Sequence, residues 1–335
     1  MKKMNFAAGA AIIAMAAGLT CACSSDDNAA RSNYPKDNVV RVATNVSDML
    51  TRGSFTTETL GDMGLSILNS GNDNYSYANV KLTKDAGKWT SAQLMLWQNS
   101  TQTVDVVAYA PYNPNVTDRV STMEKFPVSV QAVQTADDNS SDFLVFKKLG
   151  FNPGTDLNAQ GAIPVNFKHG LCQLNISIKL GTEFDQAGKL TASPIKGLTV
   201  GGTFIDGTCD FKSALSNEDI LPKITLVNGS KPQNVQPYEV PNSFKEATGT
   251  EGHEVSNATA TYSCILLPQI VEKNTFTVSF TIGDKTYQWT SPDEVDLELG
   301  KKHTLELNVG KDVVVPGTFT VKAWTDGGSS NKTTD

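Results

Sequence analysis

The sequence predicts an all-β protein built as a β-sandwich. Its 335 residues are enough for two ordinary domains or one large sandwich. Short runs rich in β-branched and aromatic residues alternate with clusters of Gly, Asn, Asp and Ser, which is the spacing of strands and turns. No long segment repeats apolar residues at the spacing of an amphipathic helix. Together these observations favour strands along the whole chain.

Residues 1–22 have the features of a signal peptide and are left out of the fold. Lys2 and Lys3 form a basic start, and the apolar stretch that follows is too short to span a bilayer comfortably. The sequence LTCACSSDD at residues 19–27 resembles the lipobox of bacterial lipoproteins. Cys23 would be the acylated residue, and Cys21 is a poorer acceptor because Thr20 precedes it. A plain secretory signal remains the alternative.

The residues after Cys23 indicate where the protein is sent. Ser-Ser-Asp-Asp at residues 24–27 resembles the acidic export tag of lipoproteins that reach the outer surface of Bacteroidota. Acyl chains such as palmitate on Cys23 would anchor the chain firmly, at about 0.8 kcal/mol per buried CH₂. Residues 23–38 are polar and predict a flexible tether. The sequence therefore predicts a lipoprotein on the cell outer membrane.

Residues 39–55 predict a first strand that a protease could remove. Val40, Val42 and Val46 keep a loose period of two, which suits a strand with one buried face. A polar loop then carries Arg52, where an extracellular arginine-specific protease could bind an extended chain. Arg41 is a weaker site because it lies inside the predicted strand. A cut after Arg52 would let the strand leave and open an apolar groove.

The first half of the chain continues as short strands separated by turns. Strands are predicted near residues 63–68, 75–83, 88–96, 103–109 and 142–146. Residues 147–161 are rich in Gly, Asn and Asp and show no strand pattern, so we expect the domain boundary there. The sequence thus predicts an N-terminal sandwich at residues 39–158 and a C-terminal one at residues 159–335.

Alternation is sharper in the second half. Apolar residues occupy every second position over residues 174–180, 276–282 and 305–309. Gly283-Asp284 follows the second of these runs and leads into Tyr287 and Trp289, which predicts a hairpin.

The tail offers two interpretations. Alternating apolar residues run to the end of the patterned sequence, broken once by Pro316-Gly317, and the candidate donor residues are Phe319, Val321, Ala323 and Trp324. One interpretation is a last strand paired within its own domain. The other is a short donor strand, residues 318–324, offered to a neighbouring subunit.

No catalytic or cofactor motif is visible. The chain has no G-x-S-x-G, H-E-x-x-H or phosphate-loop sequence, so we expect no enzyme activity, no cofactor and no metal. His169 and His303 lie in strand-like runs and are interpreted as structural. A net charge of −7 argues against nucleic acid as a partner.

Three cysteines follow the predicted leader and lipidation site. Cys172, Cys209 and Cys264 leave at least one thiol unpaired, and the sequence does not choose a disulfide among them. A different functional hypothesis is a surface lipoprotein that binds glycan or host protein through exposed aromatic residues, namely Trp89, Trp97 or Tyr112.

With these segments in place, the chain resembles the fimbrillin family of Bacteroidales, the subunits of donor-strand (type V) pili. Phe167-Lys168-His169 is the most characteristic piece. The other matching stretches are the lipobox at Cys23, the strand before Arg52, and residues 106–111, 141–145, 165–171, 266–269, 300–302 and 321–324.

The resemblance implies a fold, a processing route and a function. The fold would be two tandem Greek-key, transthyretin-like sandwiches. The first strand would be removed by an arginine-specific protease, and another subunit's strand would fill the groove. The partners would be other fimbrial subunits, and the outcome would be cell adhesion. Whether the subunit belongs to the shaft, tip or base stays open.

Overall fold

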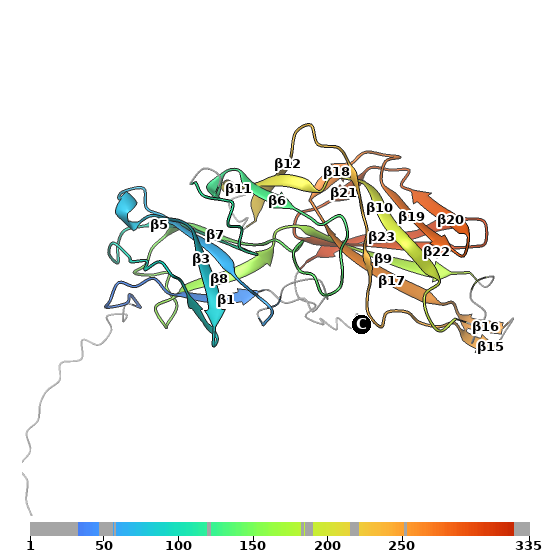
Figure 1. The fold of residues 1–335 in the computed structure, drawn as a ribbon, viewed down its shortest axis with the longest axis horizontal. Coiled ribbons are helices and arrows are strands. Elements are labelled where there is room, and N and C mark those ends of the chain that lie inside the picture. The colour runs from blue at the N-terminus through green and yellow to red at the C-terminus, as the bar shows by residue number, and fades with distance from the viewer. Residues whose placement is uncertain are drawn as a thin grey trace, which may run out of the picture. The chain divides into compact units, whose positions relative to one another are not determined.

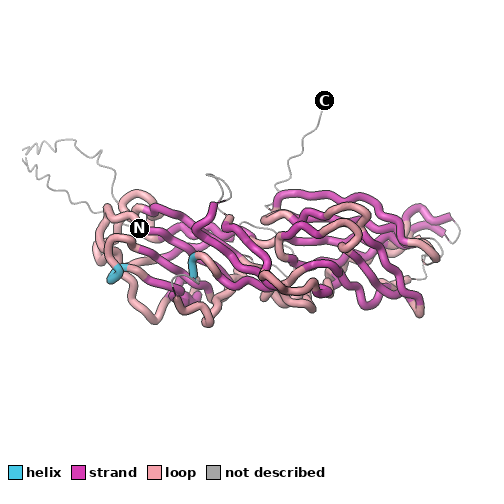
Figure 2. Tube along the Cα trace, turned by 90° about the horizontal axis from the view of Figure 1, so that it is seen from above, coloured by secondary structure: helices cyan, strands magenta, loops and turns pink. Residues whose placement is uncertain are grey.

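The computed structural model describes residues 33–46, 56, 58–118, 122–181, 184, 190–214, 221–250 and 253–324. Strands make up almost all of the regular structure, as Figure 2 shows. Within the described ranges they are interrupted by a 3-10 turn, η1 (Asp73–Tyr75), and by a helical turn at residues 122–123. The predicted all-β class is confirmed.

The N-terminal half forms a seven-stranded sheet (Figure 1). In order across the sheet, its strands are β1 (Val42–Val46), β8 (Ile163–His169), β7 (Leu144–Phe151), β5 (Val104–Ala110), β2 (Met63–Leu68), β3 (Tyr77–Asp85) and β4 (Lys88–Thr90). The sheet curves so that its two edge strands approach each other. A hydrogen bond of 2.9 Å, donated by Trp89 Nε1 of β4 to Thr44 Oγ1 of β1, connects them.

The C-terminal half contains a two-sheet sandwich. One sheet has the order β14 (Tyr238–Glu239), β17 (Thr259–Leu266), β9 (Cys172–Leu180), β22 (Lys301–Val309) and β23 (Val314–Ala323). The other has the order β13 (Gln233–Val235), β10 (Ile195–Thr203), β19 (Thr277–Ile282) and β20 (Lys285–Thr290). Leu174, Val200 and Phe280 pack in one core, which joins the facing sides of the two sheets.

Smaller sheets complete the fold. A three-stranded sheet consists of β12 (Pro222–Leu226), β11 (Asp206–Ala214) and β6 (Phe126–Ser129). Two strand pairs are β15 (Thr248–Thr250) with β16 (His253–Ser256), and β18 (Gln269–Val271) with β21 (Val295–Leu297). Since β6 comes from the first half and β11 from the second, this sheet ties the two halves together.

Strand β5 shows how the sequence builds two cores at once. Its residues Val106 and Ala108 pack into the core under the seven-stranded sheet. Val107 and Tyr109 point to the other face and pack into a second core with Phe126 of β6. A strand that is buried on both faces needs a continuous apolar run, which is what this segment has.

The expected domain boundary at residues 158/159 does not agree with the strand pairing. β7 extends to Phe151, inside the segment interpreted as a linker, and β8 pairs with both β7 and β1. A boundary drawn by strand pairing therefore falls between β8 and β9. Gly and Asn in this region form turns around short strands rather than a linker. Contacts gather Asn33–Asp335 into one compact unit, so the division into two domains stays a prediction.

The expected flexible tether also ends earlier than predicted. Tyr34 packs against the core of the first sheet, and Asn33 Nδ2 donates a hydrogen bond to Leu157 O at 3.2 Å. Residues 33–38 therefore lie against the sheet and lead directly into β1.

The hairpin predicted around Gly283 is present. Ile282 of β19 pairs with Lys285 of β20, which leaves a two-residue turn between them. Gly283 has a φ of +58°, in the left-handed region that this tight turn requires.

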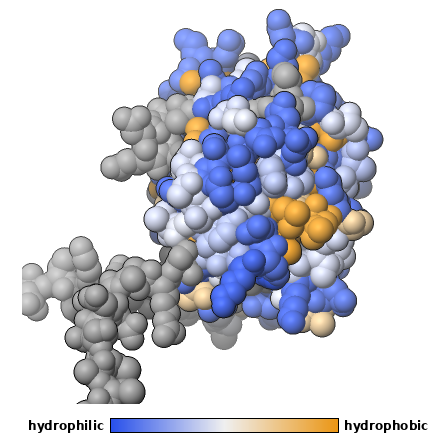
Figure 3. Space-filling model, turned by 90° about the vertical axis from the view of Figure 1, so that its left-hand side faces the viewer, coloured by the Kyte–Doolittle hydropathy of each residue, from blue (hydrophilic) through white to orange (hydrophobic). Residues whose placement is uncertain are grey.

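Figure 3 shows that the face at the N-terminal-half end of the molecule is mostly hydrophilic, with a small apolar patch. The large apolar side chains exposed in the described residues before β8 are Leu94, Val133 and Leu149. The sheet thus buries most of its apolar surface while β1 is in place.

Candidate functional site

The first candidate element is β1, which is held between two segments of chain. On one side it pairs with β8 in parallel, from Val42 opposite Ile163 to Val46 opposite Phe167. On the other side the residues just before it pair antiparallel with residues 95–97. Val40 N donates to Met95 O at 3.0 Å, and Trp97 N donates to Asn38 O at 2.8 Å. The segment from residue 38 to residue 46 therefore fills a slot in which residues 38–40 are paired on one side, with residues 95–97, and residues 41–46 on the other, with β8.

Few side chains of β1 and its lead-in are fully buried. Val40 and Val46 pack in the core, and Val42 contacts it while half-buried. A fully buried valine contributes about 1.5–3 kcal/mol. Most of the attachment of β1 thus comes from main-chain pairing and these three valines.

A hollow of about 260 Å³ lies beside the start of β1. Its walls come from residues 39–42, from Leu82 of β3 and from residues 89–95. Leu94 at its rim is 67% exposed. The slot of β1 is therefore continuous with an open apolar hollow on the side of residues 89–95.

Arg41 is a poor protease site in this fold. Its carbonyl accepts a hydrogen bond from Ile163 N at 2.8 Å, so the main chain is already paired. Its guanidinium binds Asp37 with two hydrogen bonds of 3.0 and 2.6 Å. The hydrogen bond from Arg41 lowers the pKa of Asp37 to about 2. Arg52 and Cys23, the predicted cleavage and lipidation residues, lie outside the described residues.

The second candidate element is the tail, which forms β23 and pairs antiparallel with β22. The expected break at Pro316-Gly317 is instead a bulge: the register shifts between Leu305 and Leu307, and the strand continues to Ala323. β23 lies at the edge of its sheet, so its outer side has no strand partner among the described residues.

The donor candidates on β23 are exposed, except for the last one. Phe319 is 39% exposed and Val321 is 40% exposed, and Ala323 is also exposed. Trp324 is only 2% exposed and packs in the core shared by the two halves of the chain. The structure thus separates Trp324 from the other three.

The aromatic residues of the glycan-binding hypothesis do not gather on one surface. Trp97 is 2% exposed and stacks on Phe151 in the core, which contradicts its expected exposure. Trp89 is half-buried and bonded to Thr44, as described above. Tyr112 lines a different hollow.

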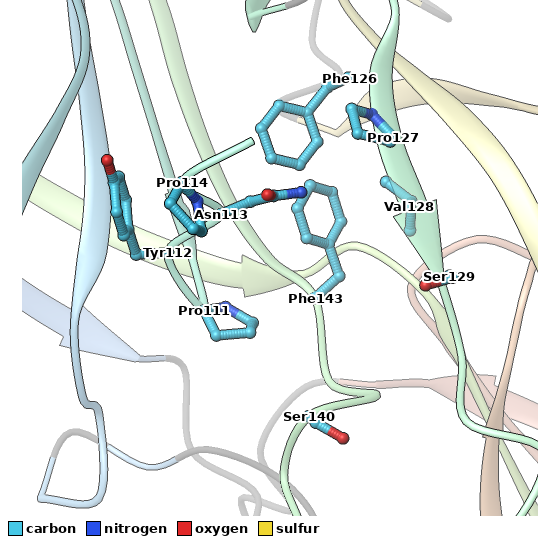
Figure 4. A pocket seen from close by; sticks show the side chains of 10 residues that line it. All are labelled: Pro111, Tyr112, Asn113, Pro114, Phe126, Pro127, Val128, Ser129, Ser140 and Phe143. Carbon is cyan, nitrogen blue, oxygen red and sulfur yellow. The ribbon is translucent and has the colours of Figure 1, made fainter. Parts of the chain in front are cut away.

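That hollow, of about 200 Å³, is drawn in Figure 4. Pro111, Tyr112 and Pro114 form one side of it, and Phe126, Pro127 and Val128 face them across the opening. Polar side chains also line it, namely Asn113, Ser129 and Ser140.

The three cysteines are free and buried, and burial raises the pKa of each thiol. We therefore expect iodoacetamide to label peptides containing Cys172, Cys209 and Cys264 at least about a hundredfold more slowly in the native protein than in urea. Peptide mass spectrometry at pH 7.5 measures both rates. Rapid native labelling at any of the three would contradict their burial.

The two strand histidines have structural partners. His303 Nε2 accepts a hydrogen bond from Glu298 N at 3.1 Å, and His169 Nδ1 lies 2.8 Å from Asp142 Oδ1. Among the described residues, no group of three His, Cys, Asp or Glu side chains is placed to hold a metal ion. In the same residues, no helix has the length and apolar character needed to cross a membrane.

Both candidate elements lie within a region that is similar to a known protein family. Residues 41–324 match the protein family described as fimbrillin-like. No curated protein sequence matches the chain. The matched range begins at the start of β1 and ends at Trp324, so it spans both candidate elements.

Two crystal structures have a similar fold. A candidate cell adhesion protein from Bacteroides uniformis is 19% identical, with a TM-score of 0.56 over 87% of this chain and 100% of that one. Another from Bacteroides ovatus is 14% identical, with a TM-score of 0.55 over 86% of this chain and 98% of that one. At these identities the likeness concerns the fold.

Proposed function

The chain belongs to the fimbrillin-like family, and from this premise we propose that it is a structural subunit of a surface fimbrium that assembles by strand exchange. The observation that carries the proposal is the way in which β1 is attached to the first sheet. β1 pairs with β8, its lead-in at residues 38–40 pairs with residues 95–97, and three valine side chains add to this main-chain attachment. A strand held in this way can be replaced by any extended segment with suitable apolar side chains.

The exchange begins with the loss of β1. A cut after Arg52 separates the strand from the rest of the chain, and its departure leaves β8 and residues 95–97 with unpaired main-chain groups. Val46 and its neighbours leave an apolar floor behind. An incoming strand restores the main-chain hydrogen bonds and covers this floor.

The tail of another subunit is the proposed replacement. Phe319 and Val321 expose apolar side chains on one face of β23, and Val315, on the other side of the bulge, is exposed as well. Buried in the slot, each would contribute about 1.5–3 kcal/mol before the cost of ordering. A phenylalanine buries more apolar surface than the valines of β1, which favours the replacement.

Export and anchoring complete the proposal. Cys23 carries the lipid that holds the subunit at the outer membrane, and an extracellular arginine-specific protease cuts after Arg52. The partners are then other fimbrial subunits, and the assembled fimbrium serves cell adhesion. Support for this part comes from the family and from the sequence features at these residues.

Limited digestion with an arginine-specific protease tests the proposal. We expect one early cut after Arg52, detected by intact mass, followed by a ladder of multimers on size exclusion. Arg52→Gln should prevent both. Arg41→Gln is the matched control and should change neither, because Arg41 is paired with Asp37 and β8.

Two results would change the conclusion. A clean cut after Arg52 without multimers would contradict assembly of this subunit into a shaft and point to a tip or anchor role. Resistance at Arg52 would contradict the processing step and favour the alternative of a surface lipoprotein that binds glycan or protein without polymerising.

A further inference from the structure

The C-terminal end of β23 is fixed by a buried stack of two rings. Trp324 lies parallel to His169 at the end of β8, with ring centroids 4.1 Å apart and planes 5° apart. Trp324 N donates a hydrogen bond to Gly300 O at 2.9 Å, and Gly300 N donates to Leu171 O, also at 2.9 Å. The stack therefore joins the tail to the junction between β8 and β9.

Asp142 holds the histidine in place. His169 Nδ1 lies 2.8 Å from Asp142 Oδ1, and both side chains are fully buried. Gly170 N donates to Phe143 O at 2.7 Å, so the main chains beside the two residues are also bonded. The imidazole ring thus has a fixed orientation before Trp324 packs on it, and it acts as a platform.

Trp324, which directly follows β23, differs from the strand in its burial. From Val315 to Ala323 the side chains of the strand are exposed, whereas Trp324 is 2% exposed. Main-chain pairing with β22 is shared along the strand, but side-chain burial is concentrated at the residue that follows it, Trp324. Loss of this one contact should therefore loosen the whole strand.

The stack also has a built-in weakness. His169 Nε2 and Trp324 Nε1 are buried and find no hydrogen-bond partner among the described residues. Buried polar atoms without partners destabilise the state that buries them. Withdrawal of Trp324 would expose both atoms to water, which partly offsets the loss of the stack.

We propose that Trp324, stacked on His169, is a latch that keeps β23 paired with β22 of its own chain. Release of this side chain frees an apolar strand for a second subunit. The use of the freed strand rests on the proposed function, whereas the latch is a property of the single chain and can be tested there.

Hydrogen–deuterium exchange of the uncleaved monomer tests the latch. Trp324→Ala should accelerate exchange of the β23 amides on the order of a hundredfold and leave β9 and β17 unchanged. Trp324→Phe retains a ring over His169, and a smaller increase, about tenfold, is expected there. Trp97→Ala is the matched control: it removes a buried tryptophan from the other core and should not affect β23.

The latch is overturned if β23 exchange is unchanged in both Trp324 variants. It is also overturned if β9 and β17 accelerate as much as β23, because Trp324 would then be an ordinary core residue. These measurements use the uncleaved monomer, so their outcome is independent of whether Arg52 cleavage produces multimers. Failure of the latch and failure of strand exchange are therefore distinguishable.

Discussion

Aspartate at positions 319 and 321 is expected to abolish multimer formation and leave the single chain folded. In the monomer both side chains are partly exposed on β23, and Phe319 stacks on His303 with ring centroids 5.8 Å apart, so Phe319→Asp/Val321→Asp should lower the free energy of unfolding by about 1–2 kcal/mol. In the vacated slot of β1, the same carboxylates would enter an apolar floor without partners. That costs several kcal/mol for each charge, enough to lower the yield of multimers at least about a hundredfold.

The strand supplies its own control. Thr318 and Thr320 lie on the opposite face of β23 and are also exposed. Thr318→Asp/Thr320→Asp adds the same charge to the same strand but leaves the apolar face intact, so multimers should still form. Urea unfolding measures the monomers, and size exclusion after Arg52 cleavage measures the multimers. Equal polymerisation of both variants would exclude the face of β23 that carries Phe319 and Val321 as the inserted surface.

Loss of the Asp142 carboxylate is expected to destabilise the protein by about 3–5 kcal/mol. Asp142→Ala leaves the fully buried His169 without its hydrogen-bond partner and makes a cavity beside it. Asp142→Asn keeps an oxygen that can accept the hydrogen bond and should cost less than half as much. Urea denaturation followed by tryptophan fluorescence measures these differences, and Trp324 reports directly on the neighbourhood.

An ion pair at the surface serves as the control for the buried Asp142–His169 contact. Asp62 and Lys81 are 2.6 Å apart at the surface, and Asp62→Ala should cost no more than about 1 kcal/mol. If Asp142→Ala were as mild as Asp62→Ala, the His169 platform would contribute little to stability. The difference between the two variants thus measures what burial adds to a carboxylate partner.

Alternation and turn residues were enough to predict most of the strands. β2, β9, β22 and the β19–β20 hairpin fall close to the expected residues, because each keeps one face in a core and ends at a turn. The local sequence pattern did not predict which sheet a strand joins where its pairing partner is distant in the sequence. The Gly- and Asn-rich turns before β8 resemble a linker and predict that it belongs to the second half, whereas its pairing with β1 and β7 places it in the first sheet.

The sequence predicted the separate elements of the candidate site but not how they are arranged in space. The sequence pointed to a first strand near Val42 and a tail near Phe319. It gave no sign that residues 95–97 form the second wall of the slot, since that pairing is a short bridge without a strand pattern. Likewise Asp142, His169 and Trp324 each lie in a stretch that resembles the family. Only the fold brings them into contact, because their spacing along the chain carries no geometric information.

The parallel pairing of β1 with β8 has a consequence for the order of folding. Val42 and Ile163 are more than a hundred residues apart in the chain, and such distant contacts form late because the intervening loop must close first. The antiparallel neighbours β2, β3, β5 and β7 can assemble earlier from nearby segments. β1 is therefore expected to add last, onto a sheet that already exists. A molecule that loses β1 returns to a conformation that it has already passed through, and its sheet is prepared to receive a strand without refolding.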